Sequence, residues 1–168
     1  SIPPNPTLLH PVRSSGTTSA PIPLLFDAPH QRGRFAARAR YLYANGWRPQ
    51  HRMAWLIGLL PGCPDGDLSR SKHLFGASFL SHIEPLDHQI DWLRRVNPIW
   101  LYAMPSSLEA LLLGMRETSS SMPQLRGIFT SGEVLEESLR QRLRQTLRVE
   151  VYDGYGTTEA FLAWQCPR

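Results

Sequence analysis

Two short segments near opposite ends of the chain carry residue types that suit binding of a polyphosphate. The first is Ser14-Ser15-Gly16-Thr17-Thr18-Ser19, in which every residue is small and most carry a hydroxyl. Such a run lets the backbone fold tightly, so that several N–H groups and hydroxyls can point at one anion. It is not a Walker A loop, because no Gly-Lys-Ser/Thr follows Gly16 at the required spacing. A flexible linker is the alternative interpretation.

The second segment is Tyr152-Asp153-Gly154-Tyr155-Gly156-Thr157-Thr158-Glu159. Its two glycines let a ligand approach the backbone, while the tyrosine between them offers a ring for stacking. Its two threonines supply donors, and Glu159 is an oxygen ligand of the kind that Mg²⁺ takes. A dinucleotide fingerprint is excluded, because Glu159 stands at the third glycine position. A glycine-rich turn around a core tyrosine remains the alternative.

Strands and helices are expected to alternate between these segments. Apolar spacing predicts helices over 31–45, 85–96, from Pro105 onward and over 133–148, and strands over 53–60, 99–103, 126–129 and 149–152. This alternation is typical of an α/β fold with a mainly parallel sheet flanked by helices. The proline-rich first 30 residues are expected to form extended strand and loop.

Ligands of open α/β sheets bind outside the carboxyl ends of the strands. Three predicted strand ends are rich in glycine, hydroxyl or acidic residues, and we expect them to converge on one edge: Met104-Pro105-Ser106-Ser107, Thr130-Ser131-Gly132-Glu133, and the segment from Asp153 to Glu159. Helix capping is the alternative role at the first two, since Thr130 and Glu133 match a capping box.

Composition narrows the classes of partner. The 168 residues hold 18 Lys+Arg and 14 Asp+Glu, a net charge of +4, and Lys72 is the single lysine. The arginines are scattered, so solvated helix faces are favoured over a nucleic-acid surface, whose best candidate is the group from Arg32 to Arg40. The longest apolar run is far too short to span a bilayer. Two cysteines make no disulfide framework, which predicts a cytoplasmic location.

Taken together and in this order, the two segments resemble the adenylate-forming superfamily of acyl-CoA synthetases. Ser14-Ser15-Gly16-Thr17-Thr18 is similar to its phosphate-binding loop, and Tyr155-Gly156-Thr157-Thr158-Glu159 to its Tyr-Gly-x-Thr-Glu motif. Ser131-Gly132-Glu133 falls where members carry a segment that lines the adenine pocket. Tyr152-Asp153-Gly154-Tyr155-Gly156 and Ala163-Trp164-Gln165-Cys166 resemble the phenylacetate-CoA ligase-like and coenzyme F390 synthetase-like branch.

The resemblance implies that a carboxylic acid reacts with ATP to give an acyl-adenylate and pyrophosphate, and that a thiol, usually coenzyme A, then accepts the acyl group. It implies that the first segment grips the β- and γ-phosphates, Tyr155 stacks on adenine, Thr158 donates to the α-phosphate and Glu159 ligates Mg²⁺. The resemblance also implies nucleotide binding by the rest of this segment: Asp153, Gly154, Gly156 and Thr157. Positioned donors and a metal can stabilise such an in-line displacement without a covalent nucleophile.

The chain departs from the family pattern in two ways. The phosphate loop continues Ser19-Ala20-Pro21 where members carry Gly-x-Pro, often with lysine. Residues 1–168 are expected to form a partial adenylation domain that lacks the C-terminal lid domain and its lysine. The alternatives are therefore a catalytically incomplete nucleotide-binding or interaction module, and a different ATP-dependent transferase or kinase. Candidates for an acyl pocket are the aromatic side chains and one histidine: Trp55, Phe75, Phe79, His82, Trp100 and Tyr102.

Overall fold

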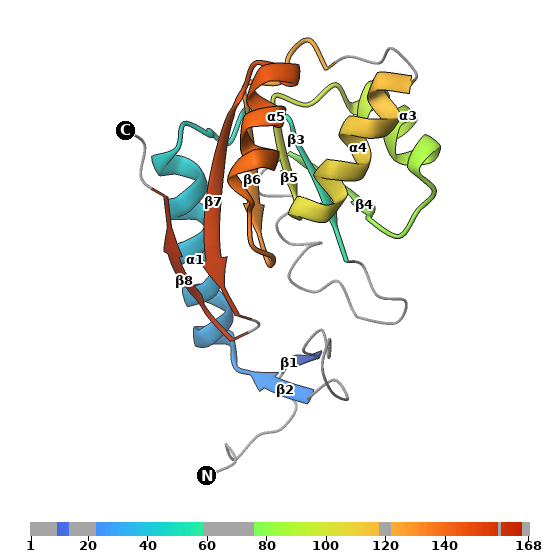
Figure 1. The fold of residues 1–168 in the computed structure, drawn as a ribbon. Helices are drawn as coiled ribbons and strands as arrows, with labels where there is room; N and C mark the ends of the chain where they lie inside the picture. The colour runs from blue at the N-terminus through green and yellow to red at the C-terminus, as the bar shows by residue number, and fades with distance from the viewer. Residues whose placement is uncertain (1–9, 14–22, 59–75, 118–121, 158, 166–168) are drawn as a thin grey trace.

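The fold is described by a computed structural model for residues 10–13, 23–58, 76–117, 122–157 and 159–165. The strands are β1 (His10–Arg13), β2 (Pro23–Phe26), β3 (Met53–Ile57), β4 (Ala77–Ser81), β5 (Trp100–Ala103), β6 (Gly127–Ser131), β7 (Glu150–Gly156) and β8 (Phe161–Trp164). The helices are α1 (Ala28–Ala44), α3 (Leu86–Val96), α4 (Pro105–Glu117) and α5 (Glu137–Leu147). Figure 1 shows how these elements are arranged.

A six-stranded sheet forms the centre of the structure, with the order β4-β3-β5-β6-β7-β8. The first five strands are parallel, and β8 pairs antiparallel with β7. Strands β1 and β2 form a separate antiparallel pair that precedes α1. The predicted α/β fold with a mainly parallel sheet is therefore confirmed.

The two faces of the sheet differ in side-chain chemistry. Successive side chains of a strand point to opposite faces, so Ala54 and Leu56 of β3 face the aliphatic core under α3, α4 and α5. Met53 and Trp55 of the same strand face the other side, which α1 covers. Aromatic residues of β5, β6 and β7 share this second face: Trp100, Tyr102, Phe129 and Tyr152.

Helices α3 and α4 follow the predicted apolar spacing. After Pro105, apolar residues at helical spacing predict one inward face of α4, and all four of them are buried: Leu108, Leu111, Leu112 and Met115. Ile90 and Leu93 of α3 are buried beside them. Within the described residues, no helix combines the length and the apolar character that crossing a membrane requires.

Helix α1 begins earlier than the predicted start at Gln31. Asp27 is its N-cap, and the Asp27 carboxylate accepts a hydrogen bond from the His30 backbone N–H at 2.8 Å. An acidic N-cap followed closely by Pro29 is a recognised start signal, and it identifies the residue that the apolar spacing missed. The helix ends as predicted, since Gly46 follows with a left-handed φ of 99°.

The contacts of His51 make the stability of the protein depend on pH. The Trp100 indole N–H and the Arg48 backbone N–H both donate to His51 Nδ1, at 3.0 and 3.1 Å, which requires this nitrogen to be unprotonated. Burial, then Arg126 and Arg48, lowers the pKa of His51 below its ordinary value. As the pH falls below about 6.5, the unfolded chain therefore binds a proton before the folded chain does, and the free energy of unfolding decreases as the pH falls further.

Replacing His51 by asparagine should weaken this pH dependence. In urea unfolding, we expect the free energy of unfolding to decrease less between about pH 7.5 and 5.5 in His51→Asn than in the wild type. An equal decrease in the two proteins would contradict this assignment.

Candidate nucleotide-binding site

The predicted strand ends meet at one edge of the sheet. Tyr102 pairs with Phe129 across β5 and β6, and Ser131 pairs with Gly154 across β6 and β7. The segments that follow these pairs therefore leave the sheet side by side. At this edge the Tyr102 hydroxyl also shares a short hydrogen bond with the Ser131 hydroxyl.

The segment after β6 has a different structure from the one predicted. Helix α5 begins at Glu137, with Glu136 as its N-cap, so the predicted start at Glu133 is wrong. The chain instead turns at Gly132, whose φ of 91° is in the left-handed region that favours glycine. This backbone geometry ends the strand without starting a helix.

The predicted capping box of Thr130 and Glu133 is also wrong. Thr130 is fully buried inside β6, and its hydroxyl donates to Asp153 Oδ1 at 2.6 Å. Glu133 caps another helix, because its carboxylate accepts from the Ser106 backbone N–H at 2.8 Å and from the Ser106 hydroxyl at 2.9 Å. Ser106 lies in the first turn of α4, where a carboxylate satisfies free N–H groups and opposes the positive end of the helix dipole.

The second sequence segment is a β-hairpin, whereas the sequence had suggested a loop after a short strand. Strand β7 continues through Gly156, and the pairing with β8 is irregular between Tyr155 and Gly156. The hairpin is closed by the Thr157 N–H, which donates to the Ala160 carbonyl at 2.8 Å. Tyr155 is 65% exposed, so its ring is accessible for stacking.

Gly154 makes room for aromatic rings of the protein. A Cβ atom at this position would lie 2.6 Å from Phe161 Cζ and 3.2 Å from Tyr41 Cε1. The sequence predicts that a ligand approaches the backbone at this glycine. The structure adds a second reason for glycine here, because two aromatic rings of the protein occupy the space that a side chain would need.

Gly154→Ala should lower the free energy of unfolding by about 1–3 kcal/mol, because the added methyl group overpacks two rings. Gly33→Ala is the matched control, since a Cβ there has nothing within 4 Å. That change should stabilise α1 by about 0.5–1 kcal/mol. Urea unfolding of both variants checks the pair, and a neutral Gly154→Ala would show that the rings are loosely packed.

Glu159 is exposed in the hairpin turn, beside Thr157. A hydrogen bond from the Thr157 hydroxyl is the largest influence on the Glu159 carboxyl, and together with the backbone N–H of Glu159 and then the Arg34 guanidinium it lowers the pKa of that group. The carboxylate is therefore ionised over the physiological pH range. Among the described residues, no group of three or more His, Cys, Asp or Glu side chains could hold a metal ion alone.

The first turn of α1 connects this hairpin to the β1–β2 pair. His30 Nε2 lies 2.7 Å from the carbonyl oxygen of Glu159, a contact across 129 residues of sequence. The same imidazole stacks on Phe26, the last residue of β2, with ring centroids 4.6 Å apart. In Figure 1 the β1–β2 pair lies at the hairpin-tip end of β7 and β8. Ser14, Ser15, Gly16, Thr17 and Thr18 belong to the connection between β1 and β2 and, like Thr158, lie outside the described residues.

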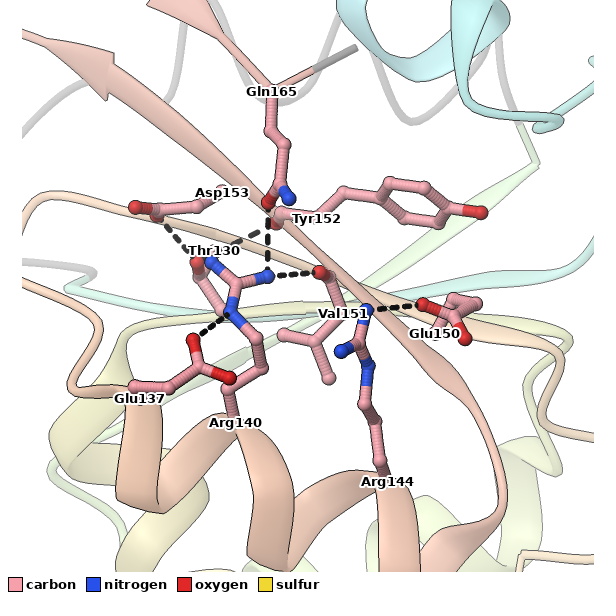
Figure 2. A network of polar contacts seen from close by, with 9 residues as sticks. All are labelled: Thr130, Glu137, Arg140, Arg144, Glu150, Val151, Tyr152, Asp153 and Gln165. Atoms are coloured by element: carbon pink, nitrogen blue, oxygen red, sulfur yellow. Dashed lines mark hydrogen bonds and ion pairs between the residues drawn. The ribbon is translucent and has the colours of Figure 1, made fainter. Parts of the chain in front are cut away.

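A polar network holds the opposite end of the hairpin (Figure 2). Arg140 of α5 is only 9% exposed, and its guanidinium donates to the Val151 carbonyl and, at 2.9 Å, to Gln165 Oε1. Glu137 pairs with Arg140 at 3.2 Å, and the Gln165 N–H donates to the Asp153 carbonyl at 2.9 Å. The prediction of a solvated arginine face on this helix is therefore wrong for Arg140, which joins α5 to β7 and β8.

Some of the predicted acyl-pocket residues lie together. Trp55 stacks on Tyr102 and on Phe79, with centroid distances of 4.3 and 5.8 Å. Trp100 packs elsewhere, against Phe129. His82 follows β4, and its N–H donates to the Ile57 carbonyl. Phe75 and Cys166 lie outside the described residues.

Two residues have no local motif that would predict their roles, because their partners are far away in the sequence: His30 and Arg140. The sequence signal that was available is the Asp27 cap, which places His30 in the first helical turn.

Comparison with protein families identifies the superfamily. The model of the AMP-binding enzyme family matches residues 75–167, more than half of the chain. The chain belongs to the AMP-binding enzyme family. A related protein is 4-chlorobenzoate–CoA ligase from Arthrobacter sp., with 27% identity over 70 residues that make up 42% of this chain and 13% of the ligase.

Solved structures of AMP-binding enzymes share the fold. 2-Hydroxyisobutyryl-CoA ligase, in an open conformation with 2-HIB-AMP and CoA, superposes with a TM-score of 0.74 at 20% identity, over 92% of this chain and 37% of the ligase. Anthranilate CoA ligase AuaEII, with anthranoyl-AMP, gives 0.70 at 20% identity, over 95% and 31%. The chain thus spans about a third of the length of these ligases and matches part of their N-terminal domain.

Proposed function

We propose that this AMP-binding chain is the nucleotide-binding part of an enzyme that activates a carboxylic acid with ATP. The products are an acyl-adenylate and pyrophosphate, and a thiol, usually coenzyme A, then takes the acyl group. The contact between His30 and Glu159 carries this proposal, because it joins the helix that follows the phosphate loop to the Tyr-Gly-x-Thr-Glu motif. Membership of the AMP-binding family supports the same chemistry.

Each segment takes a separate part of the nucleotide. Ser14, Ser15, Gly16, Thr17 and Thr18 hold the β- and γ-phosphates, and Thr158 donates to the α-phosphate. Tyr155 stacks on adenine, whose pocket is completed by Ser131, Gly132 and Glu133 on the neighbouring strand end. Asp153, Gly154, Gly156 and Thr157 belong to the same nucleotide-binding segment as Tyr155 and Thr158.

The residues at the hairpin turn fit a magnesium ion. Mg²⁺ in ATP-dependent enzymes is usually bound by one or two carboxylates, with substrate phosphates and waters completing the octahedron. Glu159 supplies one exposed, ionised carboxylate, which matches that donor set. When bound, the ion neutralises negative charge on the phosphates. The Thr157 hydroxyl hydrogen-bonds this carboxylate, and the backbone and hydroxyl donors orient the phosphates for attack by the substrate carboxylate.

We assign the chain to the phenylacetate-CoA ligase-like and coenzyme F390 synthetase-like branch, on the residues from Tyr152 to Gly156 and from Ala163 to Cys166. Coenzyme A as acceptor and a cytoplasmic location belong to this proposal. The chain would act as part of a longer adenylation domain, completed by a lid domain.

The test uses the full-length polypeptide with ATP, Mg²⁺ and a panel of carboxylic acids. We expect acid-dependent ATP–pyrophosphate exchange, and consumption of free thiol when coenzyme A is added. Release of ADP in place of pyrophosphate would contradict the proposal and indicate a kinase or another transferase.

A second candidate is a nucleotide-binding module without turnover. Ser19 and Ala20 favour it, because they stand where the family carries Gly and often Lys. Calorimetric binding of ATP without exchange would support that module.

A further inference from the structure

We propose that His30 is a positioning residue that fixes the Glu159 turn against the helix that follows the phosphate loop. This inference rests on the proposed function, and its structural part can be tested without activity. It assigns a role to a residue outside both sequence motifs.

The hydrogen bond of His30 has a defined direction. Its Nε2 lies 2.7 Å from a backbone carbonyl oxygen, that of Glu159, which can only accept. Nε2 must therefore carry the proton, in the neutral ring or in the cation. The imidazole binds the backbone carbonyl of Glu159, so the exposed carboxylate, which accepts from the Thr157 hydroxyl, is not used by this contact.

His30 is itself held from two sides. Its backbone N–H donates to the Asp27 carboxylate at 2.8 Å, so the residue is fixed in the first turn of α1. Its ring is stacked on Phe26 at 4.6 Å with an interplanar angle of 23°, and the Arg34 guanidinium lies 4.7 Å from the same Phe26 ring. A side chain restrained in this way can transmit the position of β2 to its hydrogen-bond partner.

The contacts of His30 connect two elements of the proposed site. Phe26 ends β2, the strand that follows the phosphate loop, and Glu159 is the proposed magnesium ligand. His30 contacts both, so it fixes the position of the Glu159 turn relative to the end of β2. Effective orientation of reacting groups depends on such fixed distances.

Hydrogen exchange of the full-length polypeptide tests the contact directly. In His30→Ala, amide exchange of the peptide that covers residues 154–163 should become about fivefold faster, the effect of one lost hydrogen bond. Exchange in α4 should stay unchanged. His30→Gln should restore protection, since its amide N–H₂ can also donate to the carbonyl. His88→Ala is the matched control, because His88 is another exposed histidine, and its ring contacts the Glu84 carboxylate far from the hairpin in sequence.

Kinetics separate a positioning role from a purely structural one. With an active acid substrate, His30→Ala should raise the Mg²⁺ concentration for half-maximal pyrophosphate exchange by about five- to tenfold, and His30→Gln should bring it back. An unchanged Mg²⁺ requirement in an active enzyme, or unchanged exchange of the hairpin, would overturn the role of His30. A wild type without any exchange activity would count against the proposed function, while the hydrogen-exchange result would still decide the contact.

Discussion

Replacing Glu159 by glutamine in the full-length polypeptide should lower the rate of ATP–pyrophosphate exchange by about a hundredfold or more. The substitution removes the negative charge of the carboxylate that we propose as the magnesium ligand, and it keeps the size of the side chain. Because the pKa of the Glu159 carboxyl lies below its ordinary value of 4.5, the wild type stays ionised from about pH 5 to 8. The ratio of the two rates should therefore be constant over that range.

The design of this experiment separates chemistry from folding. The side chain of Glu159 is exposed, so the variant should unfold at the same temperature as the wild type. Asp91→Asn is the control, because it removes another exposed carboxylate, on α3, which pairs only with Arg94 in the described contacts. Exchange at the wild-type rate in Glu159→Gln would exclude this carboxylate as the metal ligand.

The largest effect on stability is expected for Phe129→Ala, at about 3–5 kcal/mol in the free energy of unfolding. Phe129 is fully buried on the aromatic face of the sheet. Its ring lies 4.9 Å from Trp100, 5.1 Å from Tyr41 and 5.6 Å from Tyr152. These neighbours belong to three different elements, so the cavity left by alanine cannot close by moving one side chain.

Urea unfolding followed by tryptophan fluorescence measures this loss. Leu162→Ala on β8 is the control, because Leu162 is 57% exposed and should change stability by less than about 0.5 kcal/mol. A loss below about 1 kcal/mol for Phe129→Ala would show that the aromatic face is not a tightly packed core.

Elements with strong local signals were predicted well. Helix α4 begins at Pro105 as expected, and its apolar spacing identified the four side chains that are buried. Helix α3 and the strands β5 and β6 lie within one or two residues of their predicted positions. In α3 and α4, local periodicity and burial agree, because each helix packs one apolar stripe against the same sheet face. The strands β5 and β6 are buried on both faces, which matches their continuous apolar runs.

The errors have a common physical cause. At Glu133, acidic and apolar residues in helical spacing predicted a helix start, while the structure uses the Glu133 carboxylate on Ser106 of another element. Strands β4 and β8 were not predicted, since such short strands depend on their neighbours for pairing. Arg140 looked like a solvated residue and is buried, because two acceptors on β7 and β8 lie within its reach.

The sequence alone determined the fold class, the helix-flanked parallel sheet and the composition of both motifs, since these depend on residue type and on spacing along the chain. Only the tertiary structure decided that the second motif is a hairpin, that Gly154 accommodates the rings of Tyr41 and Phe161, and that His30 contacts Glu159. The reason is that these contacts join residues that are far apart in the sequence. Their geometry is fixed by sheet pairing and by the packing of α1, which no local pattern encodes.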